Sequence, residues 1–459
     1  RWGSMSDDRV PVPSPGAKEV MMSIMTVLVA ATLILAAFAL QPPKERVVMV
    51  NTDGYVFKDP SFSFQFMRTM GCSVYGGADI GECVQTAQRI VERDFESWCR
   101  EWTATAERVK KMGDEALARG HNISAAESYL RASTYFRAAE FYLHGNPQDP
   151  RIPYLWGESR DLFVQSLQLS GVDFERVSIA YEGTTLPGYF YKVDEGGTPR
   201  ATIIVHTGFD GTQEELYPYA LAAMKRGYNV LTFEGPGQGE VLRVQGLHFR
   251  ADWENVVTPV IDHLEARTDV DKDRIALWGI SLGGYLAPRA AAFEHRIAAL
   301  IADGGVYDIV GGQALQNAPP GSTMEQAKAW FIDGMMAEPD RFNEMFHDMM
   351  GKSTDMRWSF EHGMYAFGET TPVDYMLALA RMSMEGLAGD IVCPTLVCDA
   401  ENDTSMPKGQ AMALYENLTC PKEYRLFTDE EAAGMHCQIG AYILGNQVKL
   451  DWLMTVMAP

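Results

Sequence analysis

The stretch Arg274-Ile-Ala-Leu-Trp-Gly-Ile-Ser-Leu-Gly-Gly284 decides the fold that we predict for this chain of 459 residues. The apolar run that ends at Ile280 is typical of a buried strand, and the Ala-rich segment Tyr285–Phe293 is typical of a helix. Between them stands Gly-x-Ser-x-Gly, a tight turn that lifts Ser281 off the end of a strand. A glycine-rich turn without function is the alternative, which the flanking strand and helix disfavour. We therefore predict a nucleophilic serine, with no room for side chains at Gly279 and Gly283.

Short β-like runs alternate with helical stretches from Phe174 onwards. The first two runs predict an antiparallel pair over 174–180 and 187–193. Further strands are predicted over 201–205, 229–233, 275–280, 299–302, 394–398 and 423–427. This alternation predicts an α/β fold with a doubly wound, mostly parallel sheet, whose ligand site lies at the carboxyl ends of the strands.

Two other parts of the chain are predicted to be helical. Residues 60–170 carry apolar side chains at helical spacing over 80–94, 95–119, 124–143 and 154–169, with a capping box at Ser124 and Glu127. Residues 306–389 interrupt the strands, hold eleven of the 25 methionines, and are predicted to form a lid. Methionine suits an apolar pocket wall, although many of these side chains must simply form the core of the lid. Candidate substrate contacts in the lid are Trp330, Met335 and Tyr365.

A nucleophilic serine needs a base to take its proton and a carboxylate to orient that base. Asp403 lies in the loop after the strand 394–398 and is the preferred acid, with Asp399 and Glu401 as alternatives. Only one of the nine histidines, His436, follows Asp403, in the loop after the last strand. Solvated loop residues are the alternative interpretation, but the chain order serine, acid, histidine matches the requirement.

An oxyanion hole needs two backbone N–H groups directed at the developing negative charge. One is predicted at Leu282 and the other at Phe209, in the loop after the strand 201–205. Asp210 and Glu214 or Glu215 are expected either to support this loop or to contact substrate, and a surface role for the two glutamates is equally compatible with the pattern. The glycine-rich turn 234–239 lacks the ending of a phosphate loop and is interpreted as a packing turn.

The composition of the chain narrows the classes of molecule that it is expected to bind. The net charge of −22 disfavours nucleic acid. The seven cysteines are odd in number and lack Cys-x-x-Cys spacing, which predicts neither a disulfide framework nor a metal site and suits a reducing compartment. We expect a small-molecule substrate, no cofactor, and assembly as a homodimer.

The segment 20–40 is uncharged and long enough to span a bilayer. Three interpretations stay open: a membrane anchor, a cleaved signal, or an apolar helix docked on this protein or on a second subunit. Arg1–Ser4 resemble an expression-vector remnant, and Met49 is a candidate for the natural start. Free cysteines and a glycosylation sequon that includes Asp403 disfavour secretion, so we expect a cytoplasmic protein.

Several stretches together resemble one group of α/β-hydrolases with an N-terminal helical domain. They are Tyr75–Glu82, Ala126–Phe141, Gly208–Thr212 with Glu214 and Glu215, Phe233–Gly239, Gly279–Gly284 and Gly434–Gln438. The group includes 2,6-dihydroxypseudooxynicotine hydrolase, fungal pigment-pathway hydrolases that shorten polyketides, and, more distantly, the fermentation–respiration switch protein. The resemblance implies an α/β-hydrolase core over 171–305 and 390–459, in agreement with the predicted helical domain over 60–170 and lid over 306–389. The predicted arm over 1–59 departs from the group in its residues before 50.

The resemblance also implies cleavage of a C–C bond beside a ketone, or of an ester, in a bulky apolar or aromatic substrate. A simple carboxylesterase and a non-catalytic interaction protein on the same fold are the alternatives.

Overall fold

The computed structural model describes residues 57–194 and 196–459. The apolar segment 20–40 and nearly all of the predicted arm lie outside the described residues. Among the helices that the structure describes, none is both long enough and apolar enough to cross a membrane. All seven cysteines lie within the described residues and are free thiols.

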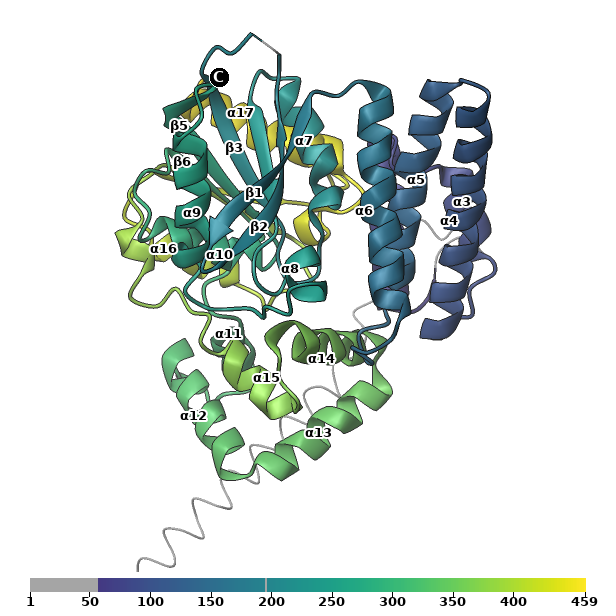
Figure 1. Ribbon diagram of the computed structural model, residues 1–459. Helices are drawn as coiled ribbons and strands as arrows, with labels where there is room; N and C mark the ends of the chain where they lie inside the picture. Colours follow the sequence, from purple (N-terminus) through teal and green to yellow (C-terminus); the bar gives the residue numbers. More distant parts are fainter. Residues whose placement is uncertain (1–56, 195) are drawn as a thin grey trace, which may run out of the picture.

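An eight-stranded sheet forms the centre of the molecule, in the order β1-β2-β4-β3-β5-β6-β7-β8 (Figure 1). Its strands are β1 (Phe174–Tyr181), β2 (Thr184–Tyr191), β3 (Arg200–His206), β4 (Asn229–Phe233), β5 (Val270–Ile280), β6 (Ala299–Asp303), β7 (Thr395–Ala400) and β8 (Lys422–Phe427). The pairs β1–β2 and β2–β4 are antiparallel, and all other neighbours are parallel. The predicted α/β fold and its antiparallel opening pair are confirmed.

Helices cover both faces of the sheet, because successive residues of its buried strands point to opposite sides and both sets are apolar. Ile203 and Val205 of β3 pack in one core with α7 (Tyr217–Met224) and α17 (Tyr442–Val456). Ile204 between them packs in the other core, with α9 (Glu254–Glu265) and α10 (Gly283–Ala291). The remaining helices of this part are α8 (Gly239–Arg243) and α16 (Gln410–Asn417).

A helical bundle precedes the sheet and lies beside it (Figure 1). Its helices are α2 (Pro60–Gly71), α3 (Ile80–Ala87), α4 (Phe95–Ala118), α5 (Asn122–Glu140) and α6 (Arg151–Ser170). Trp98, Trp102 and Tyr135 are fully buried in its core. Helix α6 also contributes Phe163 and Leu167 to the core that it shares with the sheet, which joins the bundle to the sheet.

Two local predictions in this bundle are wrong. The predicted capping box fails because α5 starts at Asn122, which places Ser124 inside the helix. The predicted helix 80–94 ends at Ala87, and Arg93 adopts a positive φ of +66°. The chain turns there because Asp94 caps the next helix, accepting a hydrogen bond from the Ser97 N–H at 3.1 Å.

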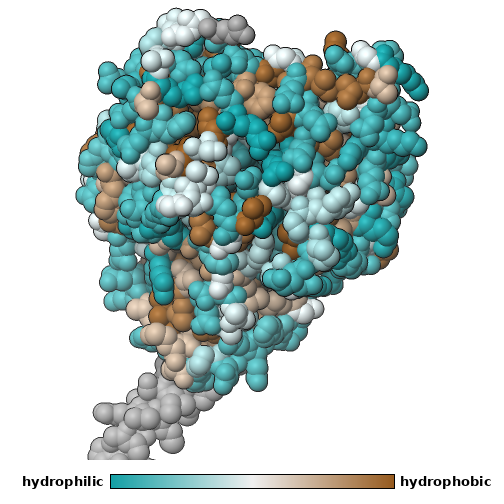
Figure 2. Space-filling model, viewed as in Figure 1, coloured by the Kyte–Doolittle hydropathy of each residue, from teal (hydrophilic) through white to brown (hydrophobic). Residues whose placement is uncertain are grey.

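The helices of the insertion lie below the sheet in Figure 1. They are α11 (Ile309–Leu315), α12 (Met324–Ala337), α13 (Pro339–Lys352), α14 (Thr354–Phe367) and α15 (Pro372–Leu379). Short 3-10 helices span Cys72–Tyr75, Gln213–Leu216, Ala388–Asp390 and His436–Gln438. Figure 2 shows a largely hydrophilic face, with brown and tan residues gathered over the inserted helices at the bottom of the view. The insertion thus carries one of the apolar areas of this face.

Candidate active site

Ser281 lies on a tight turn between β5 and α10, in a strained backbone conformation. Its φ angle is +64°, in the left-handed region that costs a non-glycine residue about 1–3 kcal/mol. Its N–H donates a hydrogen bond to the carbonyl of Asp303, at the end of β6, at 2.8 Å. This geometry presents the serine side chain outwards from the sheet.

The glycines around this turn are required by close backbone contacts. A Cβ at Gly279 would lie 2.0 Å from the Gly283 carbonyl oxygen, and one at Gly284 would lie 2.1 Å from the Gly304 carbonyl oxygen. At Gly283 the nearest atom would be 3.1 Å away. The expectation for Gly279 therefore holds, whereas the second obligatory glycine is Gly284 and not Gly283.

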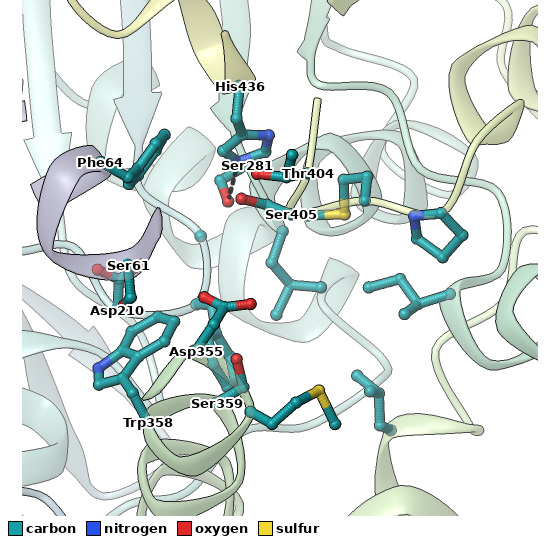
Figure 3. A pocket seen from close by; sticks show the side chains of 18 of the residues that line it. Ser61, Phe64, Asp210, Ser281, Asp355, Trp358, Ser359, Thr404, Ser405 and His436 are labelled. Carbon is teal, nitrogen blue, oxygen red and sulfur yellow. Dashed lines mark hydrogen bonds between the residues drawn. The ribbon is translucent and has the colours of Figure 1, made fainter. Parts of the chain in front are cut away.

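His436 and Asp403 form a hydrogen-bonded line with Ser281 (Figure 3). His436 Nδ1 lies 2.6 Å from Asp403 Oδ2, and His436 Nε2 lies 2.8 Å from Ser281 Oγ. Because a carboxylate can only accept, Nδ1 carries the proton and Nε2 presents its lone pair to the serine hydroxyl. The structure thus brings the three predicted residues together in the predicted order.

The two alternative acids make other contacts. Asp399 accepts a hydrogen bond from a tyrosine hydroxyl at 2.7 Å. Glu401 accepts one from a backbone N–H at 2.9 Å. Of the three carboxylates that the sequence left open, Asp403 is the one bonded to His436.

Burial and charge act in opposite directions on this pair. Burial would raise the pKa of Asp403, but His436 and the N–H groups of Ser405 and Met406, 2.8 and 2.9 Å from Oδ1, lower the pKa below its ordinary value. Burial would lower the pKa of His436, but the Asp403 carboxylate raises it well above its ordinary value. The pair therefore stabilises a positive charge on His436 once the ring accepts a proton.

The loop that carries His436 is strained and anchored by a buried ion pair. Cys437 and Gln438 have φ angles of +50° and +53°. Lys449 of α17 is 1% exposed, and it donates to Gln438 Oε1 at 2.6 Å and to the carboxylate of Asp303. Because the carbonyl of the same aspartate also fixes the serine turn, one residue couples the two loops. No pattern in the sequence indicated this anchor.

The loop after β3 lies against the serine turn. A Cβ at Gly208 would lie 2.4 Å from the Leu282 nitrogen, so only glycine permits this approach. Gln238, in the predicted packing turn, donates to the carbonyls of Thr207 and Gly208 at 2.9 and 3.0 Å. Within the described residues, neither the Phe209 N–H nor the Leu282 N–H donates a hydrogen bond to a loop carbonyl or to a side chain. Both are therefore available to a ligand beside the serine.

Asp210 and Glu215 tie this loop to the N-terminal bundle. Asp210 Oδ2 lies 2.5 Å from Arg68 and 3.0 Å from Arg137, and both arginines also pair with Glu215, at 3.0 and 2.6 Å. Burial would raise the pKa of Asp210, but the two arginines hold it well below its usual range. Glu214 is buried and accepts from a tyrosine hydroxyl at 2.8 Å. A surface role for the glutamates is therefore wrong.

Comparison with known proteins agrees with this geometry. Residues 203–437 match the model of the alpha/beta hydrolase family. The chain is also 36% identical to hydrolase LUC6 of Fusarium sp, over 87% of this chain and 97% of that protein. The chain belongs to the α/β-hydrolase family. It is an enzyme of the hydrolase class, as predicted.

Further relatives of this hydrolase are fungal. It is 35% identical to the 20-hydroxy-prefusarin hydrolase FUS2 of Gibberella moniliformis, over 88% of this chain and 98% of that one. It is 35% identical to hydrolase acrC of Aspergillus aculeatus, over 85% and 95%. Among solved structures, 2,6-dihydroxy-pseudo-oxynicotine hydrolase shares the fold, with a TM-score of 0.65 and 23% identity over 84% of this chain and 95% of that one. The resemblance stated from the sequence is confirmed.

A cavity of about 620 Å³ opens beside Ser281 in the hydrolase (Figure 3). Its walls come from α2, the loop after β3, the loop after β7 and the inserted helices. Four methionines of the insertion contribute to the lining: Met345, Met349, Met356 and Met376. The expectation that some of the methionines line a pocket therefore agrees with the structure.

Two of the four predicted substrate contacts line the cavity and two do not. Trp330 and Asp210 line the cavity, although Asp210 is already held by two arginines. Met335 does not line it, because its side chain is fully buried in the hydrophobic core. Tyr365 does not line it either, because its ring packs on His144 with centroids 5.2 Å apart. For Met335 and Tyr365 the prediction of substrate contact is therefore corrected.

Helix α2 was missed as a separate element, yet it forms one wall of the cavity. It contributes Ser61, Phe64 and Gln65 to the lining. A sequence signal existed, because Asp59 followed by proline is a helix-start pattern. In the structure Asp59 caps α2, accepting from the Phe62 N–H at 3.1 Å.

Proposed function

We propose that the hydrolase cleaves the bond beside a carbonyl carbon in a bulky apolar or aromatic substrate, through an acyl-enzyme on Ser281. The observation that carries this proposal is the hydrogen-bonded line from Asp403 through His436 to Ser281, opening into a cavity of about 620 Å³. A cavity of this size accommodates a drug-sized organic molecule. Its mixed methionine and aromatic lining favours apolar groups.

In the first step, His436 Nε2 takes the Ser281 proton as Oγ attacks the carbonyl carbon. The N–H groups of Leu282 and Phe209 stabilise the tetrahedral oxyanion. The Asp403 carboxylate stabilises the imidazolium that forms, in agreement with the direction in which it moves the pKa of His436. The imidazolium then gives its proton to the leaving group.

The leaving group distinguishes two reactions that this set of residues supports. For an ester it departs as an alcohol. For a ketone C–C bond it departs as carbon, which requires that its negative charge be delocalised as an enolate or a phenolate-type anion. In both cases water, activated by His436, releases the acid from Ser281. The relative named as acting on 20-hydroxy-prefusarin supports a large organic substrate. A simple carboxylesterase is the alternative.

A fluorophosphonate probe tests the nucleophile. We expect mass spectrometry to find one adduct, on Ser281, and none after Ser281→Ala. The same variant should lose turnover of a panel of aryl esters, acyl-phenols and β-diketones while its melting temperature stays within a few degrees of the parent. Product masses from the panel would separate ester from C–C cleavage. Absence of an adduct on Ser281 would favour the non-catalytic interaction protein instead.

Cytoplasmic location and homodimeric assembly stay predictions from the sequence. Fractionation of the full chain without detergent and its mass in solution would test them.

A further inference from the structure

The wall of the cavity opposite Ser281 carries a carboxylate with no protein partner. Asp355 lies in the first turn of α14 and points into the cavity across from Ser281 and His436 (Figure 3). Within the described residues, no hydrogen bond or ion pair reaches this carboxylate, whereas the other two carboxylates that line the cavity, Asp210 and Glu215, are both paired with arginines. Asp355 thus differs from every other acid of the lining.

A second polar group on the same side also lacks a partner. Gln65 of α2 is 5% exposed and lines the cavity. Its side-chain oxygen is buried and accepts no hydrogen bond from the described residues. Because this oxygen is closed off from the cavity as well as unpaired, a ligand in the cavity does not reach it, and Gln65 is part of the wall.

One contact brings these two helices together. Thr354, the residue before Asp355, donates its hydroxyl to the carboxylate of Asp59, which caps α2. The starts of α2 and α14 are therefore joined, although they stand 295 positions apart in the sequence. Ser61 of α2 and Ser359 of α14 line the cavity beside them. Asp355 thus lies beside hydroxyl groups at one end of a cavity whose lining mixes polar and apolar side chains.

The charges around this end favour a hydrogen-bond donor. Partial loss of surrounding water and the neighbouring Asp59 carboxylate both raise the pKa of Asp355, although its side chain stays exposed and Asp59 itself lies 3.8 Å from Arg93. The arginine that lines the cavity, Arg68, is already engaged by Asp210 and Glu215. An anionic substrate group would meet the unpaired carboxylate here, whereas a hydroxyl or amide N–H would donate to an acceptor oxygen of Asp355.

We propose that Asp355 forms a subsite that binds a hydroxyl or amide N–H at the far end of the substrate and places the scissile carbonyl at Ser281. This inference rests on the proposed function, because it assumes that the same cavity holds the substrate. It adds that the substrate is apolar in the middle and carries a hydrogen-bond donor away from the bond that is cleaved. It also adds that a carboxylate at that position is rejected.

Esters with different ends test the subsite. The probes are p-nitrophenyl esters of straight-chain acids of graded length, each made with a terminal methyl, hydroxyl or carboxylate group. At the chain length that reaches Asp355, we expect kcat/KM for the hydroxyl-ended ester to exceed that for the methyl-ended ester by roughly 10- to 100-fold, the effect of one hydrogen bond to a charged group. The carboxylate-ended ester should be the poorest of the three.

Two substitutions separate hydrogen bonding from charge. Asp355→Leu should remove the preference for hydroxyl over methyl. Asp355→Asn should keep part of that preference, because its amide oxygen still accepts, but lose most of the rejection of carboxylate. The control is Glu344→Gln on α13, which is exposed and does not line the cavity. This variant should keep both ratios of the parent enzyme.

The outcomes distinguish the inference from the proposed function. Equal kcat/KM for hydroxyl- and methyl-ended esters at every length, with turnover that depends on Ser281, would overturn the subsite and leave the function intact. If no ester is turned over, the same esters are titrated into Ser281→Ala by calorimetry. Tighter binding of a hydroxyl-ended ester, lost in the double variant with Asp355→Leu, would still support the subsite. Equal binding would refute it.

Discussion

The two sides of the cavity are built in opposite ways. On the side of Ser281, the contacts are tight and the polar side chains are paired: Gly279 and Gly208 admit no Cβ, and His436 is bonded at both ring nitrogens. On the side of α14, methionines line the wall and Asp355 has no partner within the described residues. The first side is complete without a substrate, whereas the second leaves polar groups for the substrate to satisfy. Our two proposals thus assign reaction and recognition to different segments.

The largest effect on kcat should come from replacing Asp403, the carboxylate bonded to His436. Asp403→Asn should lower kcat about 10⁴-fold, because an asparagine at this position favours the wrong tautomer of His436. The measurement is steady-state hydrolysis of an aryl ester. Asp399→Asn, near the end of β7 and bonded to a tyrosine, should change kcat by only a few-fold. Equal losses in the two variants would contradict the assignment of Asp403.

The next largest effect on kcat should come from disturbing the close backbone packing beside Ser281. Gly208→Ala would place a Cβ against the Leu282 nitrogen and push the Phe209 N–H away from the oxyanion. We expect kcat to fall about 10²- to 10³-fold, the usual effect of losing one such donor. Gly157→Ala is the matched control, because nothing lies within 4 Å of the Cβ it would add. If Gly208→Ala stays active, Phe209 does not supply the second donor.

Breaking the ion pairs that join the Ser281 side of the cavity to the helical bundle should lower the free energy of unfolding. Asp210→Ala leaves Arg68 and Arg137 without one carboxylate in a buried site, which should lower the free energy of unfolding by about 3 kcal/mol. Asp348→Ala breaks an exposed pair with Lys352 and should cost less than about 1 kcal/mol. Denaturant unfolding of both variants measures the difference. Similar values would show that Asp210 is not an anchor.

The pH dependence tests the coupling of His436 to Asp403. Because the carboxylate raises the pKa of His436 and only the neutral ring accepts a proton, kcat/KM of the parent enzyme should fall as the pH drops through that pKa. Removing the charge in Asp403→Asn lowers the pKa of His436, so its residual activity should persist to lower pH. A pH profile of both enzymes measures the shift, which we expect to be about one unit or more. An unchanged acid limb would contradict the pairing.

The smallest effect should come from a residue that links the two sides. His362 of α14 donates its Nε2 proton to the Phe209 carbonyl at 2.8 Å, and burial and His144 lower its pKa to about 3, so it is neutral. His362→Phe should lower kcat roughly 10-fold with little change in KM. His347→Phe, on the exposed face of α13, should leave both unchanged. A loss confined to KM would place His362 in recognition instead.

The Ser281 side of the cavity could be predicted from the sequence to a greater extent than the side of α14. Ser281, Asp403 and His436 were predictable because each follows a strand of a parallel sheet, and the carboxyl ends of such strands meet at one edge. The strands were predictable from their apolar runs. Asp303 and Lys449 were not, because a buried ion pair between β6 and α17 leaves no periodic pattern in the sequence. The capping box at Ser124 failed because the local pattern fits more than one helix start.

The sequence by itself determined the sheet, the serine turn and the order of the three residues around it, since these depend on local periodicity and on a few glycines. Only the tertiary structure decided which side chains face the substrate. Trp330 and Met335 are five positions apart in one apolar helix, yet one lines the cavity and the other fills the core. The starts of α2 and α14 meet beside the cavity because Thr354 binds Asp59. Such contacts arise from packing between distant segments, and no local pattern encodes them.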